Sequence, residues 1–488
     1  MTRLSAPPAR SPPSPASRRT GAAAWLRGAL AGLTALASVA APAARAQDDS
    51  STSLIRDTEI EEILKEDTAP IFRAAGLNPD DIRILIVGDR EINAFATTGP
   101  NLGMSSGSVM ALNTGLIVET KTPNELLGVV AHETGHIAGG HIARSGEGTK
   151  TAMKTFLLTM GLGIMAALAG APDAGAALLY SSNYFATLDY LAYTREQEAR
   201  ADQAAATYLE AAGMSGKGLV DFFNKFRYQE VFDAARRYPF FQSHPLSSDR
   251  IEALRARVEK LPHYATKDSP DAQARHDLMV AKLKAFINPP GQTFADYPEG
   301  DSSFIARYAR AIAYYKANET DRSLKAIDAL IADYPKDPYL FELKGQVLFE
   351  SGKIKDSEAP YRRSVELKPN APLLDINLGQ TLVAEDDPTK LDEAITYLKR
   401  AVDRESDNAF AWRVLAQAYD AKGEGGMARL ATAEQEFALG QMKDARIFAM
   451  RARELLPRNT PQWRRATDIV LVSQPSSDDL KSLAQQGG

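Results

Sequence analysis

The second half of the chain repeats a turn at a fixed interval, and this interval constrains the fold more than any other feature. The segment from Tyr334 to Pro338 recurs as the segment from Leu367 to Pro372, and Pro338 and Pro372 are 34 residues apart. An apolar helical pattern follows each turn, and a second helical pattern follows the first. Such a period is typical of stacked helix pairs that bury their apolar faces against their neighbours. We therefore expect an α-solenoid in this half.

The 34-residue period is that of tetratricopeptide repeats, and we expect a tetratricopeptide repeat domain over residues 265–474 with a C-terminal tail at 475–488. The third unit carries a short insertion around Asp387-Pro388. The last unit is lengthened by the segment GGMARLATAEQEFALG, residues 425–440. A helical bundle without true repeats is the alternative, and the coincidence of period, small residues and terminal prolines argues against it.

The first 46 residues have the composition of an export signal. They contain six arginines and no acidic residue, then an apolar run from Ala22 to Ala41, and then the small-x-small sequence Ala44-Arg45-Ala46. A disordered basic tail is the alternative. We expect cleavage after about Ala46 and an exported mature chain.

Charge and cysteine content exclude several classes of protein. The chain has 57 Lys and Arg residues against 62 Asp and Glu residues, so removal of the signal leaves 51 against 62 and a net charge near −11. An acidic chain of this kind is not expected to bind nucleic acid. Because there is no cysteine, disulfides and thiolate zinc sites are excluded, and any metal must be bound by His, Asp or Glu.

The mature N-terminal half, residues 47–264, reads as a second domain with a small sheet among helices. A helical pattern over about 53–75 is followed by the β-branched run IRILIV and further strand-like pieces split by glycines. Thr122-Pro123 with Glu125 forms a helix start of the capping-box type. A further long helix is expected from about Tyr184 to Ala212.

One internal segment, residues 155–171, is apolar enough to raise the question of a membrane. It has 17 residues and is followed by Pro172-Asp173, whereas a transmembrane helix needs about 20. We expect a buried or interfacial helical hairpin that covers the active site, with at most peripheral membrane contact. A transmembrane span is the alternative.

The stretch from Val129 to His141 contains three of the chain's six histidines. On the helix that starts at Pro123, His132 and His136 stand one turn apart on one face, with Glu133 beside them. Both imidazoles can therefore bind one metal ion. A zinc ion held there would lower the pKa of its bound water from about 15.7 to about 7, and Glu133 could take the water's proton. The pattern predicts one zinc ion per chain and a hydrolytic site.

A catalytic zinc needs three protein ligands and one open position. His141 stands one residue too early for the extended H-E-x-x-H-x-x-G-x-x-H pattern, so we expect it beside the metal site or on the surface. Glu198, on the expected helix downstream, is the better candidate for third ligand, because a carboxylate there can complete the zinc shell. Asp202 lies one turn further and can accept a hydrogen bond from a ligating imidazole. The alternative for both acids is a solvated charged face.

A third group of candidates is His244, Pro245 and Arg250. His244 near the metal would act either on transition-state charge or as an extra ligand that closes the open position. The alternative is a turn histidine ahead of a helix that begins near Ser247.

Together these residues resemble the metallopeptidase family that includes the CAAX prenyl protease, HtpX and the mitochondrial Oma peptidase. The resemblance is carried by His132-Glu133-Thr134-Gly135-His136, Glu198-Ala199-Arg200-Ala201-Asp202, Asn93-Ala94-Phe95, and His244-Pro245 with Arg250. It covers nearly the whole mature chain. It implies a mainly α fold, in which a zincin-type metallopeptidase domain with a small β-sheet precedes the α-solenoid.

The resemblance also implies roles for individual residues. It implies the zinc ligands His132, His136 and Glu198, Glu133 as general base, Asp202 as support for a ligand, His244 as a cap on the zinc in a latent state, Arg250 near the site, and Asn93, Ala94 and Phe95 in the edge strand that pairs with an extended substrate.

In its combination of an export signal, no clear membrane span and a repeat array, the chain resembles the periplasmic members of this family. This resemblance implies a zinc endopeptidase that degrades unfolded or misassembled outer-membrane β-barrel proteins, with repeats that recruit the client or the β-barrel assembly machinery. Two alternatives remain. One is a mostly latent peptidase that acts as a chaperone or binding scaffold, and the other is an integral-membrane peptidase.

Overall fold

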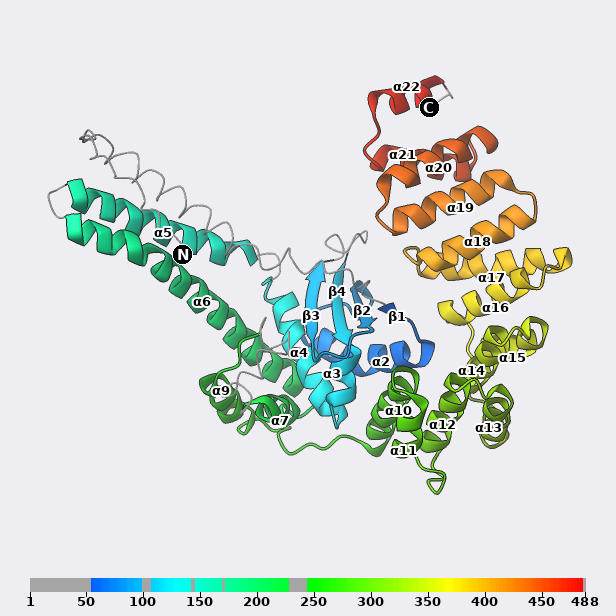
Figure 1. Ribbon diagram of the computed structural model, residues 1–488, viewed down its shortest axis with the longest axis horizontal. Coiled ribbons are helices and arrows are strands. Elements are labelled where there is room, and N and C mark those ends of the chain that lie inside the picture. Colours follow the sequence, from blue (N-terminus) through cyan, green and yellow to red (C-terminus); the bar gives the residue numbers. More distant parts are fainter. Residues whose placement is uncertain (1–53, 99–106, 142–144, 169–171, 228–243, 486–488) are drawn as a thin grey trace, which may run out of the picture. The chain divides into compact units, whose positions relative to one another are not determined.

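The structure is a computed structural model, and it describes residues 54–98, 107–141, 145–168, 172–227 and 244–485 (Figure 1). The expected export signal, residues 1–46, lies outside the described residues. The chain divides into two compact units, which are described separately. One includes residues 146–192, and the other comprises residues 52–145 and 193–488.

The first unit is a helical hairpin. Helix α5 spans Ser145–Leu168, and helix α6 begins at Pro172 and runs to Ala211, so that its last part belongs to the second unit. Phe156 of α5 packs with Ala186 of α6. The expected helix from Tyr184 thus starts 12 residues earlier than the sequence pattern indicates, because a proline fits the first turn of a helix. Among the described residues, no helix is long and apolar enough to cross a membrane.

The second unit begins with a four-stranded sheet in the order β1-β2-β4-β3. Its strands are β1 (Leu54–Ile55), β2 (Ile82–Val87), β3 (Ala94–Thr98) and β4 (Ser108–Asn113). β2 and β4 pair in parallel, and β3 pairs antiparallel with β4, with Ala94 opposite Leu112. β3 is therefore an edge strand of this sheet, and Asn93 stands just before it.

Helices of the N-terminal half share one apolar core with the sheet. They are α2 (Thr58–Ala74), α3 (Thr114–Glu119), α4 (Pro123–Ala138), the last part of α6, α7 (Lys217–Phe226), α9 (Ser248–Val258) and α10 (Pro270–Ile287), and the 3-10 turn η1 (Pro79–Asp81) precedes β2. The core includes Phe72 of α2, Met110 of β4 and Phe222 of α7, all nearly fully buried. This arrangement places α4 in the interior.

The start of α4 follows its sequence signals with one difference. Thr122 accepts a hydrogen bond from the Glu125 N–H at 3.2 Å, as an N-cap residue should. The Glu125 carboxylate, however, accepts from the N–H of Lys121 at 2.7 Å rather than from that of the N-cap residue. The helix start is therefore fixed from both sides by side chains.

The C-terminal half consists of helix pairs in series, which confirms the predicted fold class (Figure 1). The helices are α11 (Pro290–Asp296), α12 (Phe304–Lys316), α13 (Thr320–Asp333), α14 (Pro338–Glu350), α15 (Ile354–Leu367), α16 (Pro372–Ala384), the 3-10 turn η4 (Pro388–Lys390), α17 (Leu391–Arg404), α18 (Ala409–Ala421), α19 (Gly425–Ala438), α20 (Met442–Leu455), α21 (Pro461–Val472) and α22 (Ser477–Gln485). The insertion at Asp387-Pro388 forms η4.

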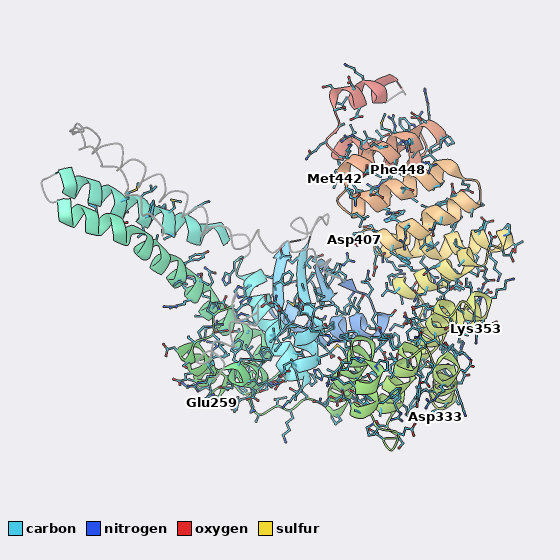
Figure 2. All side chains as sticks on the ribbon, in the orientation of Figure 1. Glu259, Asp333, Lys353, Asp407, Met442 and Phe448 are labelled. Atoms are coloured by element: carbon cyan, nitrogen blue, oxygen red, sulfur yellow. The ribbon has the colours of Figure 1, made fainter. Side chains whose placement is uncertain are left out.

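The expected lengthening of the last unit by residues 425–440 is wrong. These residues form α19, which packs against α18 through Ala428 and Ala431 and so completes that pair. Helix α20, which carries Met442 and Phe448 (Figure 2), pairs with α21 through a further apolar cluster. The small residues of α19 hid an ordinary repeat helix in the sequence pattern.

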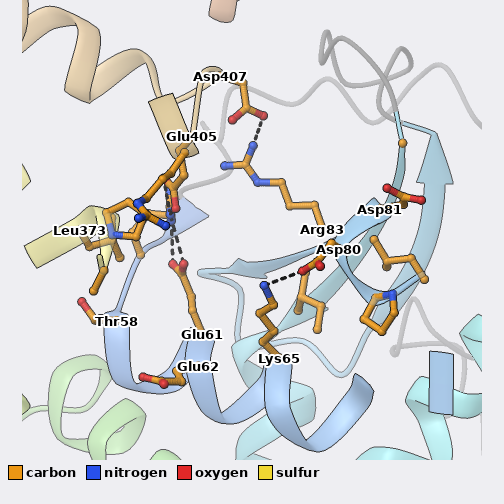
Figure 3. Close-up of a pocket in the computed structure, with 18 of the residues that line it drawn as sticks. Thr58, Glu61, Glu62, Lys65, Asp80, Asp81, Arg83, Leu373, Glu405 and Asp407 are labelled. Atoms are coloured by element: carbon orange, nitrogen blue, oxygen red, sulfur yellow. Dashed lines mark hydrogen bonds and ion pairs between the residues drawn. The ribbon is translucent and has the colours of Figure 1, made fainter. Parts of the chain in front are cut away.

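The start of α2 and the two residues before it contact both α10 and the repeats. Lys282 of α10 is buried and lies 2.9 Å from carboxylate oxygens of both Asp57 and Glu59. Arg56 forms ion pairs with Glu61 at 2.7 Å and with Glu405 at 2.9 Å. Arg83 of β2 pairs with Asp407 across the same polar cavity of about 1030 Å³, as Figure 3 shows. Sheet, α2 and repeats therefore form one connected structure.

Candidate active site

Helices α4 and α6 approach each other closely at a glycine. A Cβ atom on Gly135 would lie 2.9 Å from the Ala201 carbonyl oxygen and 3.0 Å from its Cα. The absence of a side chain at Gly135 lets the two backbones meet at this point. As a result, Glu198 and Asp202 of α6 reach the face of α4 that carries the histidines.

Four side chains converge at this contact: His132, His136, Glu198 and His244. All four are buried, and their donor atoms lie within 4.8 Å of one another. His132 Nε2 is 3.2 Å from His136 Nε2 and 3.3 Å from His244 Nδ1. His244 Nδ1 is 3.1 Å from each Glu198 carboxylate oxygen. The sequence motifs are therefore brought together as predicted, although they lie on three separate segments.

These separations fit a tetrahedral metal site. Ligands at about 2.0–2.1 Å from a zinc ion are roughly 3.3–3.4 Å apart along the edges of a tetrahedron. The distances between donor atoms of His132, His136, Glu198 and His244 that are in direct contact, 3.1–3.4 Å, agree with this value. Imidazole nitrogens and a carboxylate oxygen are ligands that zinc prefers. The residues present can therefore hold one zinc ion with four protein ligands.

Glu133 faces the same site. It is 1% exposed, and its Oε1 atom has no hydrogen-bond partner among the described residues. His244 Nε2 lies 3.4 Å from that oxygen, and the backbone N–H of Ala96 in β3 donates a hydrogen bond to the carboxyl group. Burial raises the pKa of Glu133. A buried carboxyl with an unused oxygen and a raised pKa suits a general base.

Asp202 and Arg250 contact the proposed ligands and their surroundings. Asp202 Oδ1 lies 3.0 Å from His132 Nδ1, the ring nitrogen opposite the metal-facing Nε2. Arg250 donates to the Pro245 carbonyl at 2.6 Å and lies 3.2 Å from Glu198 Oε2. The guanidinium thus links the turn that carries His244 to the acidic side chains of α6.

The electrostatics of the cluster favour charged acids and a neutral His136. Burial raises the pKa of Glu198, but its hydrogen bonds to His132 and His244 lower it well below the usual range. Burial likewise opposes ionisation of Asp202, and hydrogen bonds with His132 and Arg250 more than offset this, so its pKa is lowered. Burial lowers the pKa of His136 to about 2. A neutral imidazole is the form that binds a metal.

The remaining candidates lie around this centre. Asn93 directly precedes the edge strand β3, and Ala94 and Phe95 are its first two residues. They come just before Ala96, whose backbone N–H donates to Glu133. His141 lies next to His136, with 3.0 Å between their Nδ1 atoms. It lies outside the group of four donors, in agreement with the expectation that it is not a ligand.

Sequence reasoning missed two residues that shape the site. Phe223 of α7 places its ring edge-on to His132, with 6.0 Å between ring centroids, and the Arg250 guanidinium lies 5.7 Å from the same ring. Gly135 was read only as part of a motif, whereas it sets the spacing of α4 and α6. The amphipathic spacing of Phe222, Phe223 and Phe226 was the signal that could have placed a helix against the histidines.

Comparison with known families assigns both halves of the chain. Residues 55–258 match the model of peptidase family M48. This match assigns a peptidase family M48 domain to the N-terminal half. Residues 308–372 match a tetratricopeptide repeat model. The chain therefore joins a metallopeptidase domain, whose His132, His136, Glu198 and His244 can bind a metal, to helical repeats.

Curated proteases are similar to this chain, which spans about two thirds of the length of the relatives it matches. The chain is 24% identical over 337 residues to the β-barrel assembly-enhancing protease of Escherichia coli K12, which covers 68% of this chain and 66% of that protein. A putative β-barrel assembly-enhancing protease of Vibrio cholerae is 24% identical, with coverages of 68% and 67%. The metalloprotease LoiP of Escherichia coli is 27% identical over 182 residues, which cover 37% of this chain and 65% of LoiP. The chain is homologous to these proteases.

Proposed function

We propose that the chain is a zinc-dependent endopeptidase. His132, His136 and Glu198 would hold the zinc ion, which supplies a polarised water molecule and an acceptor for charge on the substrate carbonyl. Glu133 would take the proton from the attacking water and pass it to the leaving amine. Asp202 would keep His132 in the tautomer that binds the metal.

The tetrahedral spacing of the four buried donors is the observation that carries this proposal. Glu133 adds to it, because its buried Oε1 atom, which accepts no hydrogen bond among the described residues, lies 3.4 Å from Nε2 of the donor His244. The edge strand β3 supports a substrate role. An extended peptide that pairs with β3 through main-chain hydrogen bonds would lie next to Glu133, and such pairing demands little of the substrate sequence.

The contacts of His244 support a latent form of the enzyme. Its Nδ1 lies 3.3 Å from His132 Nε2 and 3.1 Å from the Glu198 carboxylate oxygens, so it could occupy the position that a catalytic zinc needs open for water and substrate. We therefore propose that His244 acts as a latch that must leave before turnover. A chain that remains latched would act mainly through its repeats as a binding scaffold, and this is the second candidate function.

The biological role is proposed from the homologous proteases. We propose that residues 1–46 direct export, that residues 47–264 form the peptidase, and that residues 265–474 form the repeats of a periplasmic protein. Its substrates would be misassembled outer-membrane β-barrel proteins, and the repeats would recruit either these clients or the assembly machinery. The name of the Escherichia coli relative, a β-barrel assembly-enhancing protease, supports this role. The connection between α2 and the repeats would then couple recruitment to the peptidase domain.

Degradation of casein by the purified mature chain, with zinc content measured in each sample, tests the proposal. Wild type should contain one zinc ion per chain. Glu133→Gln should retain the zinc. It should not cleave casein, either alone or combined with His244→Ala, which removes the proposed latch. Glu196→Gln, which removes an exposed carboxylate of α6 paired with Arg200, is the matched control and should behave as wild type. Zinc-free protein, or cleavage that survives in Glu133→Gln, would refute the proposal.

A further inference from the structure

We propose that His141 is a positioning residue that fixes the ring of the ligand His136 through a hydrogen bond between their Nδ1 atoms. This inference rests on the proposed zinc site. It assigns a role to a histidine outside the group of four donors. Ring geometry, backbone conformation and proton placement all agree with this role of His141.

The two rings meet at right angles and in hydrogen-bond contact. Their Nδ1 atoms are 3.0 Å apart, the ring centroids are 4.9 Å apart, and the planes are inclined at 78°. The other ring nitrogen of His136, Nε2, faces the donor cluster and lies 3.4 Å from Glu198 Oε1. His141 therefore contacts His136 on the side away from the metal position. From this side it cannot become a ligand of the same ion.

The backbone after α4 is built to return His141 to this place. Gly140 has φ of +66°, which reverses the chain at the end of the helix. The His141 N–H then donates to the His136 carbonyl at 3.0 Å, and the Gly140 N–H donates to the Ile137 carbonyl at 3.1 Å. A Cβ atom on Gly139 would lie 2.6 Å from His141 Nε2. Two successive glycines thus make room for the ring and turn it toward His136.

Proton placement gives this contact a function. When Nε2 of His136 binds a metal, the hydrogen of the neutral ring must be on Nδ1, and that N–H needs an acceptor. His141 Nδ1 is the acceptor in contact with it, and the His141 hydrogen is then on Nε2. His132 has an equivalent partner, because its Nδ1 lies 3.0 Å from Asp202. Each ligating histidine of α4 is therefore held at its outer nitrogen by a different residue.

Zinc affinity of the full mature chain tests the role of His141. The variants are His141→Phe, which keeps a planar ring without an acceptor, and His141→Asn, whose amide oxygen can take the place of Nδ1. Competition with a chromophoric chelator gives the zinc affinity, and the visible spectrum of the cobalt-substituted protein reports ligand geometry. His263→Phe is the control, because His263 pairs with Glu210 and lies outside the donor group.

We expect His141→Phe to lose about 10-fold to 100-fold in zinc affinity and to change the cobalt spectrum. His141→Asn should bind zinc more tightly than His141→Phe, and His263→Phe should match wild type. Gly139→Ala, which keeps His141 but displaces its ring, should also lose affinity, and it replaces His141→Phe if that variant does not fold.

Equal zinc affinity in wild type, His141→Phe and Gly139→Ala would overturn the inference. An equal loss in His141→Asn and His141→Phe would overturn it as well, because the hydrogen bond would then not be the cause. Wild-type protein that binds no zinc would instead refute the proposed metal site itself, so the two failures are distinguishable.

Discussion

Arg250 and Asp202 form a buried, two-pronged ion pair. Nε and Nη2 of Arg250 donate to the two carboxylate oxygens of Asp202 at 2.8 and 2.9 Å. A third donor, Nη1, reaches the carbonyl of Pro245, directly after His244. One side chain therefore supports both the residue behind the ligand His132 and the turn that carries the latch.

Replacement of Arg250 by alanine should destabilise the protein strongly. It would leave Asp202 buried without its charged partner, and removal of one member of a buried pair costs about 3–5 kcal/mol. Urea unfolding of the metal-free chain measures this directly. Arg257→Ala on the same helix removes an exposed arginine that donates a hydrogen bond to Thr207, and it should change the free energy of unfolding by less than about 0.5 kcal/mol. Equal effects of the two substitutions would contradict this account.

Gly135→Ala should separate α4 from α6. The added methyl group would meet backbone atoms of Ala201 at 2.9–3.0 Å, and overpacking of this kind costs about 1–3 kcal/mol. Because Glu198 reaches the histidines only through this approach, zinc affinity should fall together with stability. Gly425→Ala in α19 meets only one atom, at 3.9 Å, and should be neutral or slightly stabilising. Unchanged zinc affinity in Gly135→Ala would show that the close approach does not position Glu198.

Removal of the metal should lower the stability of the peptidase domain. A ligand that binds only the folded state adds about 2.7 kcal/mol when its free concentration is 100 times its Kd. Thermal unfolding after chelation should therefore occur at a lower temperature, and zinc should restore the original value. Magnesium should not restore it, since a cluster of three histidines and one carboxylate suits zinc and not a hard cation. Identical unfolding with and without zinc would argue against a structural contribution of the metal.

The contact between α2 and the repeats should weaken as the pH rises. Burial raises the pKa of Glu342 to about 8, and Lys282 opposes this shift. A carboxyl whose pKa is raised in the folded state contributes stability that is complete below its ordinary pKa, 4.5, and lost once the pH has passed about 8. In that window the loss is at most about 1.4 kcal/mol per pH unit.

Glu342→Gln isolates this effect, because the amide does not titrate and can still accept from Thr58, as Glu342 does at 2.8 Å. As the pH rises from 5 to about 8, wild type should lose unfolding free energy relative to Glu342→Gln. A constant difference over that range would contradict the raised pKa.

Local signals in the sequence predicted much of the site. The spacing of His132 and His136 on a capped helix, and that of Glu198 and Asp202 on another, follows from helix geometry alone. Their meeting could not be derived, because it depends on a backbone approach between Gly135 and Ala201 that no local pattern encodes. The family resemblance supplied the connection instead.

In the repeats, the overall pattern was predicted, but one helix and the attachment to α2 were not. Their 34-residue period predicted helix pairs, but the residues of α19 were read as a lengthening of the last unit because Gly425, Gly426 and several alanines conceal the apolar face of this helix. The attachment of α2 to the repeats was also absent from the sequence analysis. Lys282 and Glu59 are 223 residues apart and each looks like an ordinary surface charge in sequence, whereas in the structure they form a buried ion pair.

The most direct test of the central claim compares casein cleavage by His244→Ala with that by wild type, at equal zinc content. If His244 closes a zinc peptidase site, His244→Ala should cleave faster than wild type, and the double variant Glu133→Gln with His244→Ala should not cleave at all. A zinc-loaded His244→Ala variant that cleaves no faster than wild type, or more slowly, would contradict the latch.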